Sequence, residues 1–227
     1  MFIIAAALLL LLLIPHDAFA WGPGFHLQIG TTVLGNLQSL SPAVATLLGK
    51  YPLDFLYGCI AADITIGKKF THYLQHCHRW PMGLKVLSNT TVKSQEACAL
   101  GYLSHLAADT VAHNYFVPYK IMLSISTLTM KHTYWEMRFD SAVDKKIWEV
   151  GERVATGHYK RNDVLLRKVL SETLFSFATN KRIFNSILLL GRMEKWQGVI
   201  STVSSLSRYV LEENDRQEYT ALSEEAV

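Results

Sequence analysis

The feature that most constrains the fold is a stripe of metal-binding side chains in an otherwise apolar segment. In HLAADTVAH, His105, Asp109 and His113 are spaced at i, i+4 and i+8. An α-helix advances by about 100° per residue, so each step drifts by only about 40° and the three side chains stay on one face. Burying such groups is costly unless a divalent metal ion or a core network of paired side chains satisfies them. The segment therefore predicts a buried helix with a polar centre.

A second pair of potential ligands has the same spacing. His132 and Glu136, in KHTYWEMRFD, are separated by four residues. An exposed helical pair is the ordinary explanation for this spacing. Because the pair follows the first stripe closely, the two elements strengthen each other, since helical bundles build metal sites from side chains on facing helices.

A third cluster lies upstream of both. Asp63 stands in the apolar context GCIAADITIG, and His72, His76 and His78 follow it. An ionised aspartate in such a setting needs a cation or strong hydrogen-bond donors. The alternative for the three histidines is a solvated loop, which we expect to hold for at least one of them.

Elsewhere the apolar residues recur mainly at spacings of three and four, which is typical of helices. This pattern predicts helices near 27–37 and 97–117, then a break at Val117-Pro118 and another helix beyond it. Stripes between 164 and 211 predict helices that close the core, whereas the polar stretch from Glu213 onward is predicted to fray. Alternating strand patterns are scarce, so the predicted fold class is an all-α, single-domain helical bundle.

The first twenty residues have the pattern of a signal peptide. An apolar run from Phe2 to Ile14 precedes the small-x-small sequence Ala18-Phe19-Ala20. One feature departs from the pattern, because no Lys or Arg precedes the apolar run. The run is nevertheless shorter than the roughly 20 residues that a membrane span requires. We therefore expect a signal peptide at 1–20, a single domain at 21–227 and export to the periplasm or the extracellular space. An uncleaved N-terminal anchor is the alternative.

Charge and cysteine content leave several possibilities open. The formal net charge of +3 is too small to imply a nucleic-acid partner by itself. Three cysteines, Cys59, Cys77 and Cys98, match no zinc-ribbon spacing. They allow one disulfide at most, or buried free thiols.

Taken together, these elements resemble the zinc-dependent phospholipase C family. That family includes bacterial phospholipases C and the N-terminal domain of the GPI-specific phospholipase D, and the fungal single-strand nucleases are structurally similar relatives. Its members begin the mature chain with Trp and bind three zinc ions in an all-helical fold. Cleavage after Ala20 would leave WGPGFH, with Trp21 at the first position and His26 close behind it. The resemblance covers Trp21 to about Asp140, with the motif elements in the family's order.

The resemblance implies three sets of zinc ligands. The first set is Asp63, His78, His105 and Asp109; the second is the amino nitrogen and carbonyl oxygen of Trp21 with His26 and, as a bridge, Asp109; the third is His113, His132 and Glu136. His78 is preferred because its distance from Asp63 is close to the family interval, and because CHRWP resembles the family's His-Trp segment. Participation of His72, His76 or Cys77 stays open.

The resemblance also implies an activity. We expect an exported, phospholipase C-like phosphodiesterase that hydrolyses a phosphate ester of a phospholipid by attack of zinc-bound hydroxide. Asp63 would orient or deprotonate the water. The charge count points the same way independently, because the carboxylates of Asp63, Asp109 and Glu136 offset only half the charge of three zinc ions. The remaining positive charge would attract a phosphoryl group.

Two other functions remain open at this point. One is a single-strand nuclease with the same metal core, for which Tyr115, Tyr119, Tyr134 and Trp135 could stack bases, although such aromatics are more often core. The other is a non-catalytic, zinc-stabilised binding module. Peripheral contact with a membrane surface is compatible with a lipid substrate, and no protein partner is predicted. The sequence does not determine the headgroup or the oligomeric state.

Overall fold

The computed structural model describes residues 21–65, 76–123, 131–170, 175–191, 198, 202 and 210–227. Within these ranges the side chains of 131–133 and 191 are not described. The expected signal peptide at 1–20 and His72 lie outside the described residues.

Regular structure in these ranges is helical, and no described residue lies in a strand, which confirms the all-α prediction. The helices are α2 (Pro23–Gly35), η1 (Leu37–Ser39), α3 (Pro42–Lys50), α4 (Pro52–Cys59), η2 (Ala61–Ile64), α5 (Trp80–Ser88), α6 (Lys93–Val111), η5 (Ala112–Phe116), α7 (Val117–Leu123), α8 (Lys131–Asp140), α9 (Lys145–Thr156), α10 (Lys160–Val169), α11 (Phe177–Gly191) and α13 (Glu213–Ala226).

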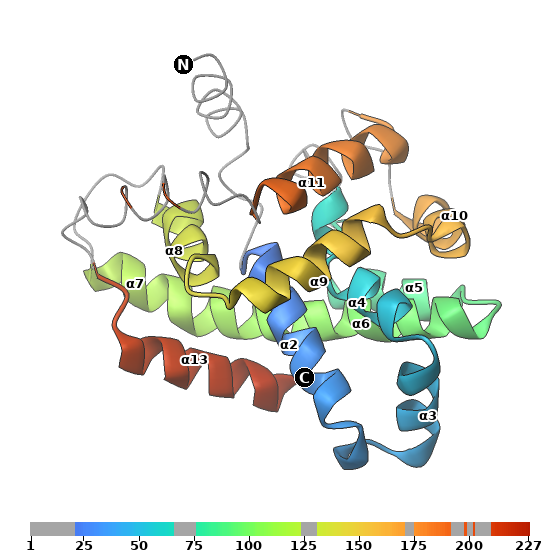
Figure 1. Ribbon diagram of the computed structural model, residues 1–227, viewed down its shortest axis with the longest axis horizontal. Helices are drawn as coiled ribbons and strands as arrows, with labels where there is room; N and C mark the ends of the chain where they lie inside the picture. The colour runs from blue at the N-terminus through green and yellow to red at the C-terminus, as the bar shows by residue number, and fades with distance from the viewer. Residues whose placement is uncertain are drawn as a thin grey trace.

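One long rod, formed by α6, η5 and α7, runs through the middle of the molecule (Figure 1). Helices α4, α5 and α13 pack against α6, while α2 contacts α4, α6 and α9. In Figure 1, α13 lies along one side of the rod, and α9 and α11 lie on the other. The part of the chain that is described contains no helix long and apolar enough to cross a membrane.

Local signals explain where several helices begin. Proline occupies the first turn of α2, α3, α4 and α5, where a missing N–H costs no helical hydrogen bond. Ser41 precedes the proline of α3, although its side chain makes no capping hydrogen bond. Helix α9 is capped by Asp144, whose carboxylate accepts a hydrogen bond from the Lys146 N–H at 2.7 Å.

The tightest packing in the fold joins α4 to α6. A Cβ atom at Gly58 would overlap the carbonyl group of Cys98, and one at Gly101 would overlap the carbonyl oxygen of Phe55. The two backbones therefore touch directly, which only glycine allows. This approach brings the end of α4, followed by η2, against the middle of α6.

Two helical predictions are wrong. Pro118 does not break the rod, because a π-helical turn precedes it at η5 and the proline falls at the start of α7. The polar stretch from Glu213 forms α13 instead of fraying, since Tyr219 packs against Phe116 with ring centroids 5.0 Å apart. Lys120 also pairs with Asp215, which fixes α13 to α7.

The cysteine alternatives are resolved by the structure. Cys59, Cys77 and Cys98 are all buried, and none of the three forms a disulfide bond. Burial raises the pKa of the Cys59 and Cys98 thiols above their ordinary value, so both behave as small apolar core residues.

The contact between α4 and α6 predicts a strong effect of one methyl group. Gly101→Ala should lower the free energy of unfolding by about 3 kcal/mol or more, the upper end for overpacked cores, because a backbone oxygen cannot move aside. Gly35→Ala is the control, since no heavy atom lies within 4 Å of its Cβ position. Urea denaturation of both variants checks the prediction, and equal stabilities would contradict it.

Candidate metal centre

His105 and Asp109 lie one turn apart on α6, in the middle of the core. They are 0% and 3% exposed, and His105 Nε2 lies 3.2 Å from Asp109 Oδ2. His105 Nδ1 donates a hydrogen bond to the carbonyl oxygen of Cys59 at 2.8 Å, at the end of α4. Because a carbonyl only accepts, Nδ1 carries a proton, and Nε2 is the ring nitrogen that faces the cluster. The close approach of α4 and α6 thus also fixes the tautomer of His105.

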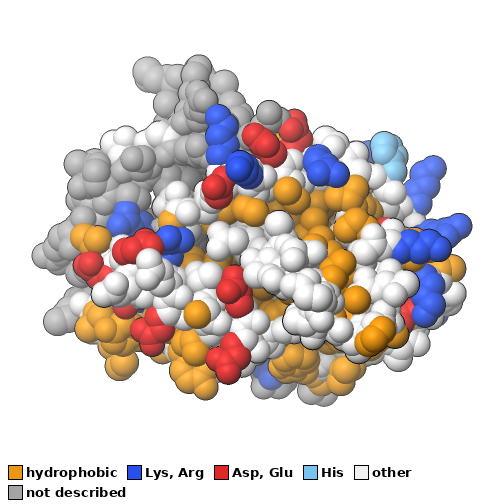
Figure 2. Space-filling model, turned by 60° about the horizontal axis from the view of Figure 1, so that its bottom comes forward, with side chains coloured by type: hydrophobic (Ala, Val, Ile, Leu, Met, Phe, Trp, Pro, Cys, Tyr) orange, Lys and Arg blue, Asp and Glu red, His pale blue; other side chains and the backbone are white. Residues whose placement is uncertain are grey.

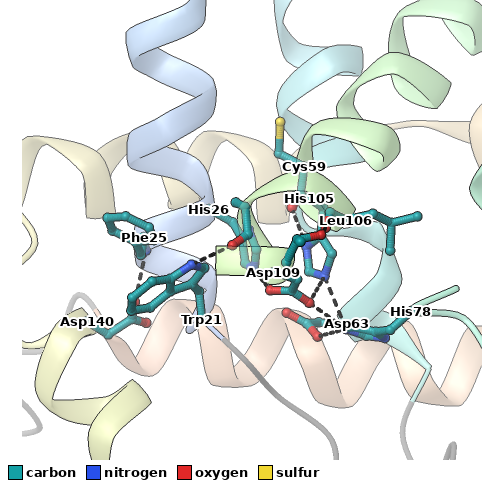
Figure 3. A network of polar contacts seen from close by, with 12 residues as sticks. Trp21, Phe25, His26, Cys59, Asp63, His78, His105, Leu106, Asp109 and Asp140 are labelled. Carbon is teal, nitrogen blue, oxygen red and sulfur yellow. Dashed lines mark hydrogen bonds and ion pairs between the residues drawn. The ribbon is translucent and has the colours of Figure 1, made fainter. Parts of the chain in front are cut away.

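Asp63 and His78 lie next to the pair formed by His105 and Asp109 (Figure 3). Asp63, on η2, is 1% exposed, and its Oδ1 lies 3.1 Å from His78 Nε2. The same nitrogen lies 3.4 Å from Asp109 Oδ2 and 3.1 Å from His105 Nε2. The Tyr102 hydroxyl on α6 donates to the Cys77 carbonyl at 2.5 Å and so holds the His78 segment against that helix.

His26 reaches Asp109 from α2. Its Nε2 lies 3.1 Å from Asp109 Oδ1, and its ring stacks on that of His105 with centroids 3.8 Å apart. The two oxygens of Asp109 therefore face different histidines, Oδ1 towards His26 and Oδ2 towards His78 and His105. This is the disposition of a carboxylate that bridges two ions.

The electrostatics of the cluster favour a bound cation. His26 Nε2 and both oxygens of Asp109 are buried and, despite the short distances, make no hydrogen bond. Burial would raise the pKa of Asp109, but the neighbouring His105 and His26 outweigh it and hold the pKa well below its ordinary value. Burial and the nearby His105 lower the pKa of His26, so this ring stays neutral. Burial also lowers the pKa of His105, but Asp109 and Asp63 outweigh it and raise that pKa above its ordinary value. An ionised carboxylate among converging imidazole nitrogens fits Zn²⁺, which takes nitrogen and oxygen ligands.

Trp21 lies beside this cluster. Its indole ring is fully buried against Phe25, Phe116 and Phe139, with ring centroids 4.3 to 4.9 Å apart. Its Nε1 donates a hydrogen bond at 2.9 Å to the carbonyl oxygen of Ala108, the residue before Asp109. Figure 3 shows Trp21 between Asp140 and the histidine–aspartate cluster.

The third expected ligand set is only partly described. Glu136 is buried on α8, whereas His113 is exposed in η5. The helix is not an α-helix throughout this stretch, because a π-helical turn begins at Ala112 and includes His113. The side chain of His132 lies outside the described residues, so the grouping of these three ligands stays a prediction.

Two neighbours of His78 add further donor atoms. Cys77 Sγ lies 3.2 Å from His78 Nδ1, and His76 Nδ1 accepts a hydrogen bond from the His78 N–H at 3.3 Å. His76, Cys77 and His78 form a group that could hold a metal ion, as do His26, His105 and Asp109, and Asp63, His78 and His105. Contact with Cys77 on Nδ1 leaves Nε2 of His78 turned towards Asp63 and Asp109.

Sequence reasoning missed Asp140. Its carboxylate accepts hydrogen bonds from the N–H groups of Gly24 at 3.1 Å and Phe25 at 2.9 Å. Burial raises the pKa of this carboxyl to about 7, although the two N–H donors lower it. The one signal in the sequence was its position four residues after Glu136, which places both on one face of α8.

The fold and the cluster together define an all-helical protein with a buried histidine–aspartate centre suited to metal ions. Comparison with known families agrees with this class: the family model for zinc-dependent phospholipase C matches residues 25–181, more than half of the chain. The chain belongs to the zinc-dependent phospholipase C family. The matched region contains every side chain of the cluster, and Trp21 lies just before it. No curated protein and no solved structure matches the chain.

The position of Asp109 predicts the effect of its removal. Asp109→Asn should release zinc from both sides of the carboxylate and cancel most of the zinc-dependent rise in Tm, because metal stabilises the fold only through the sites it occupies. Asp54→Asn is the matched control, since this partly buried carboxylate contacts Asn162 instead of the cluster. Elemental analysis with thermal unfolding checks the prediction, which fails if both variants keep the same zinc content.

Proposed function

We propose that the chain is an exported, zinc-dependent phosphodiesterase of the phospholipase C type, which hydrolyses a phosphate ester of a phospholipid. One observation carries the proposal. His78 and His105 lie beside Oδ2 of Asp109 in the core, with Asp63 next to His78, and His26 lies beside Oδ1. Membership of the family supports zinc as the metal and a phospholipid as the substrate class.

The proposed ligands form three sets. One zinc ion would be held by Asp63, His78, His105 and Asp109, a second by the main-chain nitrogen and oxygen of Trp21 with His26 and Asp109, and a third by His113, His132 and Glu136. The separate orientations of the two Asp109 oxygens support its role as the bridge. The contact between Trp21 Nε1 and the Ala108 carbonyl supports a position of Trp21 next to that bridge.

Bound zinc would supply Lewis-acid chemistry, lowering the pKa of water and stabilising negative charge on phosphoryl oxygens. Asp63 would orient the attacking water and accept its proton, a role that suits a carboxylate buried at the rim of the cluster. His105, with its proton fixed on Nδ1, would keep its other nitrogen for the metal throughout the reaction. The apolar core around Asp109 would exclude bulk water, and the electrostatic interactions of these groups would be stronger at the lower dielectric constant.

Export is part of the proposal. Removal of residues 1–20 would turn the Trp21 amide into an α-amino group, which is a far better ligand at neutral pH. Contact with the substrate would be peripheral, at a membrane surface.

A single-strand nuclease with the same metal core remains the second candidate. The exposed rings of Tyr115 and Tyr119 favour it, because exposed aromatic rings can stack on bases. Trp135 is buried and belongs to the core. Figure 2 shows acidic and basic side chains scattered among hydrophobic ones on one face, rather than a uniformly basic surface. A non-catalytic zinc module is the third alternative.

The proposed function predicts zinc content and activity together. The chain starting at Trp21 should bind about three zinc ions and hydrolyse a chromogenic phosphocholine ester, whereas Asp63→Asn should lower kcat by about 10²-fold or more. The test measures zinc content by elemental analysis. It also measures hydrolysis of a panel of phospholipids and single-stranded nucleic acids, with and without zinc. One metal or none after zinc-replete refolding contradicts the three-zinc proposal. Hydrolysis of nucleic acid alone selects the nuclease.

The N-terminal ligand predicts an effect of chain length. Two extra residues before Trp21 should leave folding intact but lower the zinc content by about one ion and remove most of the activity, since an amide nitrogen is a poor ligand. Two extra residues after Val227 are the matched control. Full zinc and full activity in the N-terminally extended protein would refute the Trp21 ligand and leave the other two sets standing.

A further inference from the structure

The carboxylate of Asp140 ties the last residue of α8 to the first turn of α2. Its two oxygens accept the N–H groups of Gly24 and Phe25 separately, at 3.1 and 2.9 Å. The N-cap residue of α2, Gly22, has no side chain to cap the helix, so a residue more than a hundred positions away does so. A buried anion at a helix N-terminus is stabilised by these donors and by the helix dipole.

The residues at the start of α2 fit closely around this carboxylate. A Cβ atom at Gly22 would overlap the carboxylate of Asp140, and one at Gly24 would lie 2.6 Å from the ring of Trp148. Both positions therefore need glycine for the close approach. The segment between Trp21 and α2 cannot shift without breaking this packing.

Trp21 is held from the other side by its ring. Phe25, Phe116 and Phe139 enclose the indole, and Phe139 is the residue before Asp140. The indole N–H is fixed on the Ala108 carbonyl, one residue from Asp109. With its side chain anchored and the following turn fixed by Asp140, the main chain of Trp21 has a defined place between them (Figure 3).

We infer that Asp140 is a positioning residue for the metal centre, which sets the main-chain atoms of Trp21 and the ring of His26 against Asp109 through the first turn of α2. His26 belongs to the same turn, since its N–H bonds to the Gly22 carbonyl at 3.2 Å. The inference rests on the proposed function in one respect, the ligation of zinc by the Trp21 main chain. In this role Asp140 acts through the first turn of α2 and would not itself be a zinc ligand.

The test compares Asp140→Ala and Asp140→Asn with Asp144→Ala in the protein that starts at Trp21. Asp144 is the matched control, because it also caps a helix but lies at α9, outside the cluster. Removing a residue that orients metal ligands should lower the affinity of one site for zinc by about 10- to 100-fold, measured by competition with a chelator. Asp140→Asn, which retains an acceptor oxygen, should recover part of that affinity. Asp144→Ala should keep native zinc affinity while losing thermal stability without zinc.

Two further variants separate positioning from general support of the fold. Gly22→Ala should reproduce the loss of zinc affinity with the carboxylate intact, because its Cβ would push against Asp140. In the protein with two residues added before Trp21, Asp140→Ala should reduce zinc affinity less than in the native chain, since the two changes act on one ligand.

Unchanged zinc affinity in both Asp140 variants overturns the inference and leaves the proposed function intact, provided that the N-terminal extension still removes one ion. An equal loss in Asp144→Ala also overturns it, because that result marks a general effect of helix stability. No zinc uptake by the unaltered chain starting at Trp21 rejects the proposed function and this inference together.

Discussion

The structure depends on the burial of two carboxylates, Asp63 and Asp109, in the centre of an apolar helical core. Each is 3% exposed or less, and the groups that surround Asp109 are imidazole nitrogens in place of lysine or arginine. Desolvating a carboxylate costs several kcal/mol, and at Asp109 this cost is opposed by the neighbouring His105 and His26, which hold the pKa of the carboxyl below its ordinary value. A divalent cation between these side chains would add positive charge beside the buried carboxylates. We therefore expect metal binding to stabilise the folded core.

The packing of α4 against α6 assembles this centre. Because Gly58 and Gly101 let α4 and α6 touch, the carbonyl of Cys59 reaches His105 and η2 delivers Asp63 to the same place. Much of this could be predicted from the sequence: the i, i+4 spacing of His105 and Asp109 requires one helical face, and an aspartate in an apolar run requires a partner. The all-α class could also be predicted, because apolar residues at spacings of three and four fall on one face of a helix.

What the sequence did not reveal depends on contacts between distant segments or on local backbone geometry. A π-helical turn occupies Ala112–Phe116 and includes His113, and nothing in the i, i+4 pattern signals it. Helix α13 is polar by composition and is held by the packing of Tyr219 on Phe116. The role of Asp140 arises because the N-terminus of α2 meets the end of α8, a tertiary contact without a local motif. Such features are decided by packing after the helices form.

The central claim is that zinc occupies the space around Asp109. The most direct measurement is a crystal structure of the chain starting at Trp21, with anomalous diffraction data collected on both sides of the zinc absorption edge. The account predicts a zinc peak on each side of Asp109, one shared with His78 and His105 and one shared with His26. An anomalous map without a peak in contact with Asp109, from zinc-replete crystals, would contradict it.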